Sequence, residues 1–269
     1  LVAGREVVLA SWYYDIGSDP NSNGEKGVRV ALADVTTPSS VSYRHLLLVE
    51  PTMAGNQVDF LPIHIHAGGM AWVGDLLYVA DTTHGFRVFD MTQIMQVATA
   101  ENTIGWDPVD GVHYAGLYKY VVPQVGNYER SGDCSPRFSF VALDRSASPP
   151  ALVSGEYDAG SLFGRLFHWP LFPSTDRLAP ATSFPKLALF SLHSHLQGAV
   201  ASGPTHWLSS SEPPAGHGDL YVAGEGTASQ TVTWVDAPED LQLDVPRNKL
   251  WSLSEGHGER YVFAVAPPP

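Results

Sequence analysis

The stretch from His64 to Asp90 constrains the fold more than any other part of the sequence. Three short β-forming segments lie in it, at residues 67–73, 76–80 and 86–89. A Gly74-Asp75 turn separates the first two segments, and a polar connection at residues 81–85 separates the last two. Short β-forming runs bounded by Gly, Asp and Thr indicate antiparallel strands joined by tight turns. The stretch therefore predicts a β-meander.

Weaker copies of this pattern recur along the chain and predict five units of three or four strands. Their approximate boundaries are residues 1–55, 56–125, 126–190, 191–235 and 236–269. Units of roughly 54 residues suit the blades of a β-propeller, and helical periodicity is almost absent. We therefore expect an all-β chain whose residues 1–269 form a single five-bladed β-propeller domain. The spacing of the units is irregular, so the strands of a β-sandwich remain the alternative.

Some segments depart from the repeat. A short helical turn is expected at residues 91–97, with Asp90 as its cap. Residues 99–112 have no clear period and are interpreted as an insertion, after which residues 117–123 supply a fourth strand. The first unit lacks an inner strand and the last lacks an outer one, so we expect either a processed amino terminus or an incomplete blade that closes the ring.

Composition excludes several classes of protein. The chain is 44% hydrophobic and only 16% charged, which allows a substantial core and argues against disorder. The formal net charge is −13 and no basic stripe is present, so we expect no nucleic-acid partner. No run of 18 apolar residues occurs, so we expect no membrane insertion. The single cysteine, Cys134, forms no intrachain disulfide, and we expect a monomer.

Polar residues gather where the innermost strands of the predicted propeller begin. Aligning these strands places His66 and His195 at one level, and Arg137, Gln197 and Glu239 at the level two residues further on. Two imidazoles and a carboxylate on one axis would support acid–base chemistry or bind a metal ion, and the guanidinium would hold an anionic group. Under the alternative interpretation, channel mouths are wet, and these side chains only satisfy loop carbonyls.

The two histidines of this level each belong to an H-x-H pair. His64 precedes His66, and His193 precedes His195, a spacing that puts both rings on one side of an extended strand. A metal-assisted reaction would use one divalent ion, Ca²⁺, Zn²⁺ or Cu²⁺, with His66 and His195 as its ligands. In a chain with 11 histidines, such pairs also arise by chance.

Carboxylates recur where the second strands of the units end, and aromatic residues accompany them. The acids are Asp15, Asp81, Asp158, Glu212 and Glu255. Turn caps on a solvated rim explain them, and a carboxylate pair for glycoside hydrolysis is the sharper alternative. Trp12, Tyr14 and Tyr157, with Gln197, are candidate substrate contacts, although most aromatics pack blades. No nucleophile elbow, P-loop, dinucleotide-binding or C-x-x-C motif is present.

Three runs of the sequence carry a resemblance to a known group of proteins. They are HAGGMAWVGDLLYVADTTHGFRVFDM, HLQGAVASG and PEDLQLDVPRNKLWSLSEGHGERYVFAV. The chain resembles, from about Arg29 to Val265, exported actinobacterial-type propeller proteins usually labelled only as secreted proteins. The resemblance implies an extracytoplasmic five-bladed propeller. It implies no catalytic residue.

These observations favour an extracellular enzyme, a lyase or a hydrolase, that acts on a polysaccharide or a small metabolite at the channel mouth. His66 and His195 would be the acid and base or the metal ligands. Glu239 would be their carboxylate partner, and Arg137 would hold an anion. The alternative is a non-catalytic propeller that binds carbohydrate or protein in aromatic pockets between its blades.

Overall fold

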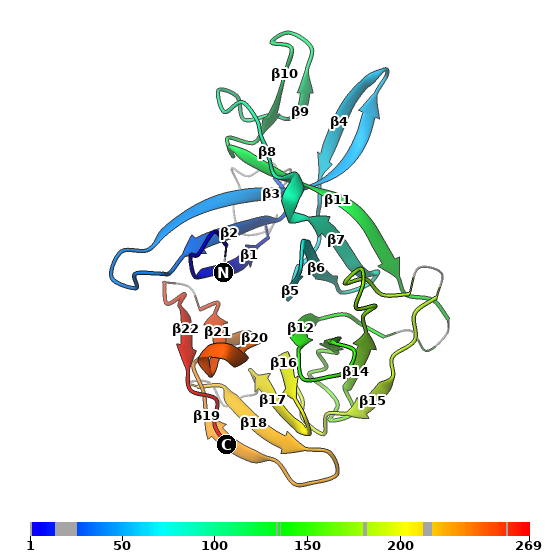
Figure 1. Ribbon diagram of the computed structural model, residues 1–269, viewed down its shortest axis with the longest axis vertical. Coiled ribbons are helices and arrows are strands. Elements are labelled where there is room, and N and C mark those ends of the chain that lie inside the picture. The colour runs from blue at the N-terminus through cyan, green and yellow to red at the C-terminus, as the bar shows by residue number, and fades with distance from the viewer. Residues whose placement is uncertain are drawn as a thin grey trace. The chain divides into compact units, whose positions relative to one another are not determined.

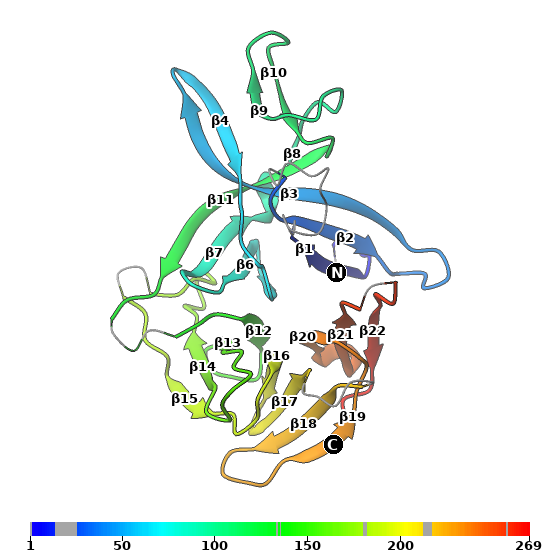
Figure 2. The ribbon, with the colours of Figure 1, turned by 180° about the vertical axis from the view of Figure 1, so that it is seen from behind.

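The computed structural model describes residues 2–13, 26–132, 134, 136–179, 182–211, 217–256 and 258–269 (Figures 1 and 2). Across these residues it contains strands β1 to β22 and two short 3-10 helices, η1 and η2, and no α-helix. The prediction of an all-β chain is confirmed. The chain forms two compact units. Unit 1 comprises Leu1–Ala67, Asp75–Leu77 and Arg87–Asn127, and unit 2 comprises Gly68–Gly74, Tyr78–Phe86 and Tyr128–Pro269.

Unit 1 is built on a sheet in which β1, β2 and β3 pair antiparallel and β11 pairs with β3 in parallel. Its elements are β1 (Val7–Trp12), β2 (Arg29–Asp34), β3 (Ser42–Ala54), β4 (Gln57–Pro62), η1 (Met91–Gln93), β8 (Met95–Gln96), β9 (Ile104–Asp107), β10 (Val112–Ala115) and β11 (Tyr120–Glu129). Strand β4 folds back on β3 as a long hairpin, and β9 and β10 form a second hairpin. Strands β6, β7 and β11 each contribute residues to both units.

The parallel pairing of β3 with β11 explains the most apolar part of β3. Residues 46–49 are buried without interruption, whereas the rest of the strand is mostly exposed. Tyr120 to Pro123 lie beside these four residues. A strand that is covered on both faces needs a continuous apolar run, because neither side of its pleat meets water. Leu47, Val49, Phe60 and Val121 form the core here.

Unit 2 contains three antiparallel meanders of consecutive strands, coloured from green to red in Figure 1. Its elements are β5 (Met70–Val73), β6 (Leu76–Asp81), β7 (Gly85–Asp90), β12 (Phe140–Asp144), β13 (Ala151–Gly155), β14 (Arg165–Pro170), β15 (Leu187–Phe190), β16 (Leu196–Ser202), β17 (Thr205–Ser210), β18 (Asp219–Gly224), β19 (Gln230–Thr233), β20 (Pro238–Asp244), η2 (Val245–Arg247), β21 (Lys249–Ser254) and β22 (Val262–Val265). The meanders are β12 to β15, β16 to β19, and β20 to β22.

The first strands of the meanders lie against one another. Strand β12 contacts β5, β16 and β20, and β16 also contacts β20. Glycine allows this approach: a Cβ on Gly198 would stand 2.6 Å from Cα of Asp240, and one on Gly69 would stand 2.5 Å from the backbone nitrogen of Val141. These distances are shorter than real Cβ contacts, so the strands meet backbone to backbone.

The spaces between the meanders are filled by side chains that alternate along β16. Ala199 and Ala201 belong to one buried cluster with Phe140 and Leu166, whereas Val200 belongs to another with Leu241. Because successive side chains of a strand point to opposite faces, one strand contributes to two cores. The β16–β19 meander thus packs against a neighbouring meander on each face.

The sequence predicted a short helical turn and an insertion between β7 and β11. Asp90 caps η1 as predicted, since its side chain accepts a hydrogen bond from the backbone nitrogen of Thr92, although the helix is a single 3-10 turn over Met91–Gln93. Residues 99–112, which were interpreted as an insertion without a clear period, carry most of the β9–β10 hairpin. The segment that starts with Tyr120 is a strand, β11.

Candidate functional site

The structure distributes the predicted site residues over both units. Trp12 and His66 belong to unit 1, and Arg137, Tyr157, His195, Gln197 and Glu239 belong to unit 2. Tyr14 lies outside the described residues. Because His66 and His195 belong to different units, a shared site for the two histidines stays a prediction.

His195 stands directly before β16 in a left-handed backbone conformation, with φ of 53°. Its backbone nitrogen donates to the carbonyl oxygen of Asp158, and its own carbonyl accepts from the nitrogen of Ser211. The imidazole meets the ring of Tyr157 edge-on, with centroids 5.8 Å apart. A non-glycine residue at positive φ is strained unless its surroundings hold it, so His195 is fixed by the loops on both sides.

The same entrance geometry recurs at β20. Ala237, directly before that strand, also has a positive φ, of 44°, and both β16 and β20 shift register within their first residues. Gln197 and Glu239 follow at the same offset, two residues after the left-handed residue. Gln197 is tied to the same loop as His195, since its Nε2 lies 3.4 Å from Oγ of Ser211. The structure therefore brings His195, Tyr157 and Gln197 to one place.

Two neighbouring carboxyl groups stand at the start of β20, where Glu239 is buried and Asp240 is half-buried. Asp240 is held by the chain, because it accepts hydrogen bonds from the backbone nitrogens of Leu241 and Met70. Burial raises the pKa of Asp240 well above its usual range. Glu239 is only 9% exposed and makes no hydrogen bond with the part of the chain that the structure describes.

Burial, and then the electrostatic effect of the neighbouring carboxyl groups of Glu255 and Asp240, raises the pKa of Glu239 to about 9. Its carboxyl group therefore carries a proton near neutral pH. Glu255 lies on the adjoining strand end, where its backbone nitrogen donates to the carbonyl oxygen of Ala237. Unlike Glu239, it is exposed. The two acids therefore lie close together in environments of very different polarity.

Arg137 is exposed, and its guanidinium makes no hydrogen bond or ion pair with the described residues. Its backbone nitrogen donates to the carboxylate of Glu156. The guanidinium of Arg165 donates two further hydrogen bonds of 2.7 Å to this carboxylate. Although burial acts to raise it, the hydrogen bonds from Arg165 and the backbone hold the pKa of Glu156 below its usual range. This ion pair, which the sequence patterns did not indicate, positions the loop that carries Arg137.

The predicted metal ligands are engaged in ring contacts. His66 is exposed and lies on the ring of Tyr13, with centroids 4.7 Å apart. His193 stacks on Tyr221 at 3.6 Å, and its Nε2 lies 3.0 Å from Oγ of Ser229. Within the described ranges, no three His, Cys, Asp or Glu side chains are grouped so that they could hold a metal ion. Trp12 carries the guanidinium of Arg29 over its ring.

The sequence patterns also did not indicate a pair of buried histidines in unit 2. His168 on β14 and His206 on β17 are buried, and their Nε2 atoms lie 3.0 Å apart. Burial lowers the pKa of both rings, and the charge of His206 adds to this effect on His168. The pair is neutral near pH 7, with one nitrogen donating and the other accepting, because two protonated rings would repel.

No helix among the described residues has the length and apolar character needed to cross a membrane. Comparison of the sequence with protein families gives no match, and comparison with curated proteins gives none either.

Proposed function

We propose that the chain is a five-bladed β-propeller of the exported, secreted-protein type that hydrolyses glycosidic bonds of a polysaccharide or a smaller glycoside. The propeller is supported by the three consecutive meanders, by the contacts of β12 with β5, β16 and β20, and by the recurring left-handed residue before β16 and β20. Repetition of one meander with its first strand innermost is the construction of a propeller.

The hydrolase is supported above all by Glu239. A buried carboxyl with a pKa of about 9 keeps its proton at neutral pH, and the charge of Glu255 helps to hold it there. Glycoside hydrolysis needs this combination, one protonated carboxylic acid and one carboxylate. Glu239 would give its proton to the glycosidic oxygen as the C–O bond breaks. Glu255 would attack the anomeric carbon or take a proton from the attacking water.

Other polar and aromatic side chains of unit 2 suit the binding of a sugar. Gln197 supplies amide groups for hydroxyls, and the edge-to-face pair of Tyr157 and His195 presents an aromatic platform. The guanidinium of Arg137, which has no partner among the described side chains, would hold an anionic substituent. Glu239 and Asp240 could not act together on one bond, because neighbouring side chains of a strand point to opposite faces. Glu239 and Glu255 come from different strand ends and are free of this restriction.

The test is Glu239→Gln, which keeps the shape of the side chain and removes its proton. Wild-type protein should release reducing ends from at least one member of a panel of neutral polysaccharides, and the variant should be about 10²- to 10⁴-fold slower. With a dinitrophenyl glycoside, whose leaving group needs no proton, the variant should lose far less of the wild-type rate. Glu101→Gln, at an exposed position of unit 1, is the matched control. Equal rates for the Glu239→Gln variant and the wild type on the polysaccharide would refute the role of Glu239.

The second candidate is a carbohydrate-binding propeller without catalysis. The tyrosine–histidine pairs favour it, since Tyr157 with His195 and Tyr13 with His66 both form ring contacts of the kind that sugars stack on. In that case the wild-type protein would bind glycans without cleaving them, and Glu239→Gln would bind as well as the wild type. Calorimetric titration of the same panel separates the two functions.

A further inference from the structure

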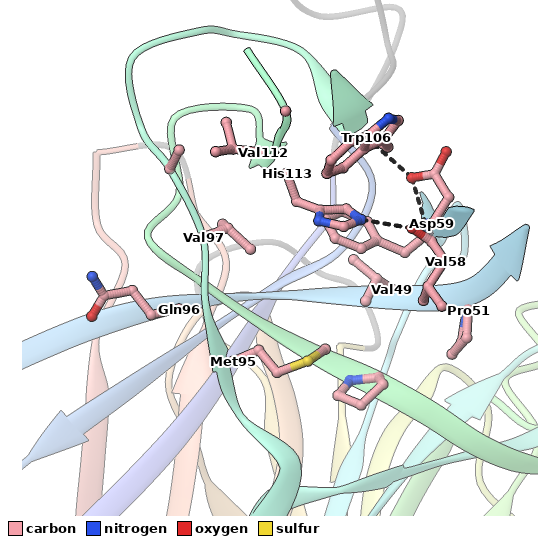
Figure 3. Close-up of a pocket in the computed structure, with 14 residues that line it drawn as sticks. Val49, Pro51, Val58, Asp59, Met95, Gln96, Val97, Trp106, Val112 and His113 are labelled. Carbon is pink, nitrogen blue, oxygen red and sulfur yellow. Dashed lines mark hydrogen bonds between the residues drawn. The ribbon is translucent and has the colours of Figure 1, made fainter. Parts of the chain in front are cut away.

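Unit 1 contains a cavity of about 560 Å³ that the proposed hydrolase does not use. It lies between the β3–β4 hairpin and the chain from β8 to β10, and Figure 3 shows the side chains that line it. Most of them are apolar, among them Phe60, Met95, Val97, Trp106 and Val112. Small-molecule sites have this size and this predominantly apolar lining, with a few polar groups that orient the ligand.

One carboxylate braces the aromatic wall of the cavity. Oδ1 of Asp59 accepts hydrogen bonds of 2.7 Å from the backbone nitrogens of Phe60 and Trp106, which ties β4 to β9. Gly105 makes this approach feasible: its φ is 102°, and a Cβ there would stand 2.7 Å from Oδ1 of Asp59. The wall is therefore built before any ligand arrives, which reduces the entropy lost on binding.

His113 supplies the polar group of the cavity in a defined tautomer. Its ring stacks on Phe60 at 5.4 Å and meets Trp106 edge-on at 5.1 Å. Nε2 lies 2.8 Å from the carbonyl oxygen of Val58. A carbonyl only accepts, so Nε2 carries the hydrogen and Nδ1 is left as an acceptor. In Figure 3 the bonded nitrogen faces Val58 and the other nitrogen is turned away from it.

We propose that this cavity binds a flat, mostly apolar molecule of one or two rings that donates a hydrogen bond to Nδ1 of His113. The aromatic walls match a ring in shape, and the fixed tautomer favours an O–H or N–H donor over an acceptor. A sugar fits poorly, because its many hydroxyls would lose water against apolar side chains. The lining also includes large exposed side chains, Val58 at 62% and Met95 at 45%, which a ligand would cover.

The probes are β-naphthol and its methyl ether, which differ in a single O–H donor. Titration calorimetry on the full chain should give naphthol a dissociation constant about two- to tenfold lower, the usual worth of one hydrogen bond. His113→Phe keeps an aromatic ring and removes the acceptor, so the two probes should then bind equally. Equal binding to the wild type, or a preference for naphthol that survives in His113→Phe, would overturn the proposal.

A pair of matched substitutions in one hairpin tests the location. Val112→Trp fills the cavity and should abolish binding of both probes, whereas Val109→Trp, at a position that is 90% exposed and outside the lining, should leave both dissociation constants within twofold. Loss of binding in both variants, or in neither, contradicts the assignment. If instead Val112→Trp dissociates a dimer in sedimentation, the occupant is a second copy of the chain and the proposal fails.

Discussion

The inner strands of unit 2 and the hairpins of unit 1 break the usual rule of burial in opposite directions. At the start of β20, the carboxyl group of Glu239 is enclosed by protein and that of Asp240 is partly withdrawn from water, which raises the pKa of both. Around β4, the apolar side chains of Val58 and Leu61 are more than half exposed, while Asp59 is satisfied by backbone nitrogens. Buried polar groups and exposed apolar groups are the two observations that mark function. This comparison underlies both proposals, proton chemistry in unit 2 and apolar binding in unit 1.

The largest expected effect tests how tightly the inner strands of unit 2 are packed. Gly198→Ala would put a Cβ 2.6 Å from Cα of Asp240 and 2.7 Å from the nitrogen of Leu241, and backbone atoms cannot swing aside. We expect a loss of about 3 kcal/mol in the free energy of unfolding, measured with a chemical denaturant.

The matched control for Gly198 lies in unit 1. Gly126 on β11 has an ordinary φ, and no atom lies within 4 Å of the place that a Cβ would take, so Gly126→Ala should be neutral or stabilise by up to about 1 kcal/mol. If both substitutions change the free energy of unfolding equally, the first strands of the meanders are packed less tightly than their contacts indicate. The predicted difference in packing between the two sites would then be wrong.

The second prediction concerns the effect of Glu239 on the free energy of unfolding at different pH values. Its folded pKa of about 9 lies above the ordinary value of 4.5, so the folded state keeps a proton that the unfolded state releases. Stability from this group is therefore complete below about pH 4.5 and is lost as the pH rises toward 9. Glu239→Gln should raise the unfolding free energy near neutral pH by roughly 1–3 kcal/mol and flatten this slope. A variant less stable than the wild type throughout this window would show that Glu239 has a purely structural role.

A third prediction addresses the wall of the cavity in unit 1. Asp59→Ala leaves the nitrogens of Phe60 and Trp106 without their acceptor and should cost about 1–2 kcal/mol of stability. Binding of the methyl ether probe should weaken in parallel, because the wall is no longer ordered. Asp59→Asn, which keeps one acceptor oxygen, should recover most of both losses. Weakened stability with unchanged probe binding would separate the carboxylate from the cavity.

The smallest expected effect concerns the His168–His206 pair of unit 2. Burial depresses the pKa of both rings, so the unfolded chain takes up protons near pH 6.5 that the folded chain refuses, and stability falls as the pH drops through this range. Between neutral pH and one unit lower, we expect a loss of about 1 kcal/mol. Glu239 changes the unfolding free energy with pH in the opposite direction, so the measurement is made in the Glu239→Gln variant. Adding His206→Gln to that variant should reduce the loss of stability at low pH. An unchanged loss in the double variant would exclude the pair as its source.

Local patterns predicted most of the strands, because their information is carried by neighbouring residues. The alternation of Ala199, Val200 and Ala201 and the cap at Asp90 can be read within a few positions. The parallel pairing of β3 with β11 could not, since it joins residues more than 70 positions apart in sequence and no local signal encodes the register. The β9–β10 hairpin was missed for another reason: its strands of four residues are too short to show a period.

The candidate site, too, was predicted from the sequence only in part. Aligned strand starts predicted the equivalence of Gln197 and Glu239, and the recurring left-handed residue before each strand supports it. The pattern selected Glu239 as a candidate site residue and interpreted the exposed Glu255 as a turn cap, but it did not indicate that the pKa of Glu239 is raised. The closeness of His66 to His195 stays a prediction.

The sequence by itself determined that the chain is all-β and organised in meanders, because a period of two and its turns are written in consecutive residues. Only the tertiary structure decided which polar groups lost their water. Asp240 accepts from Met70 across 170 positions of sequence, and Glu239 is enclosed by strands that meet only in the folded state. The chemistry of a carboxyl group depends on its dielectric surroundings, and those surroundings come from distant parts of the chain.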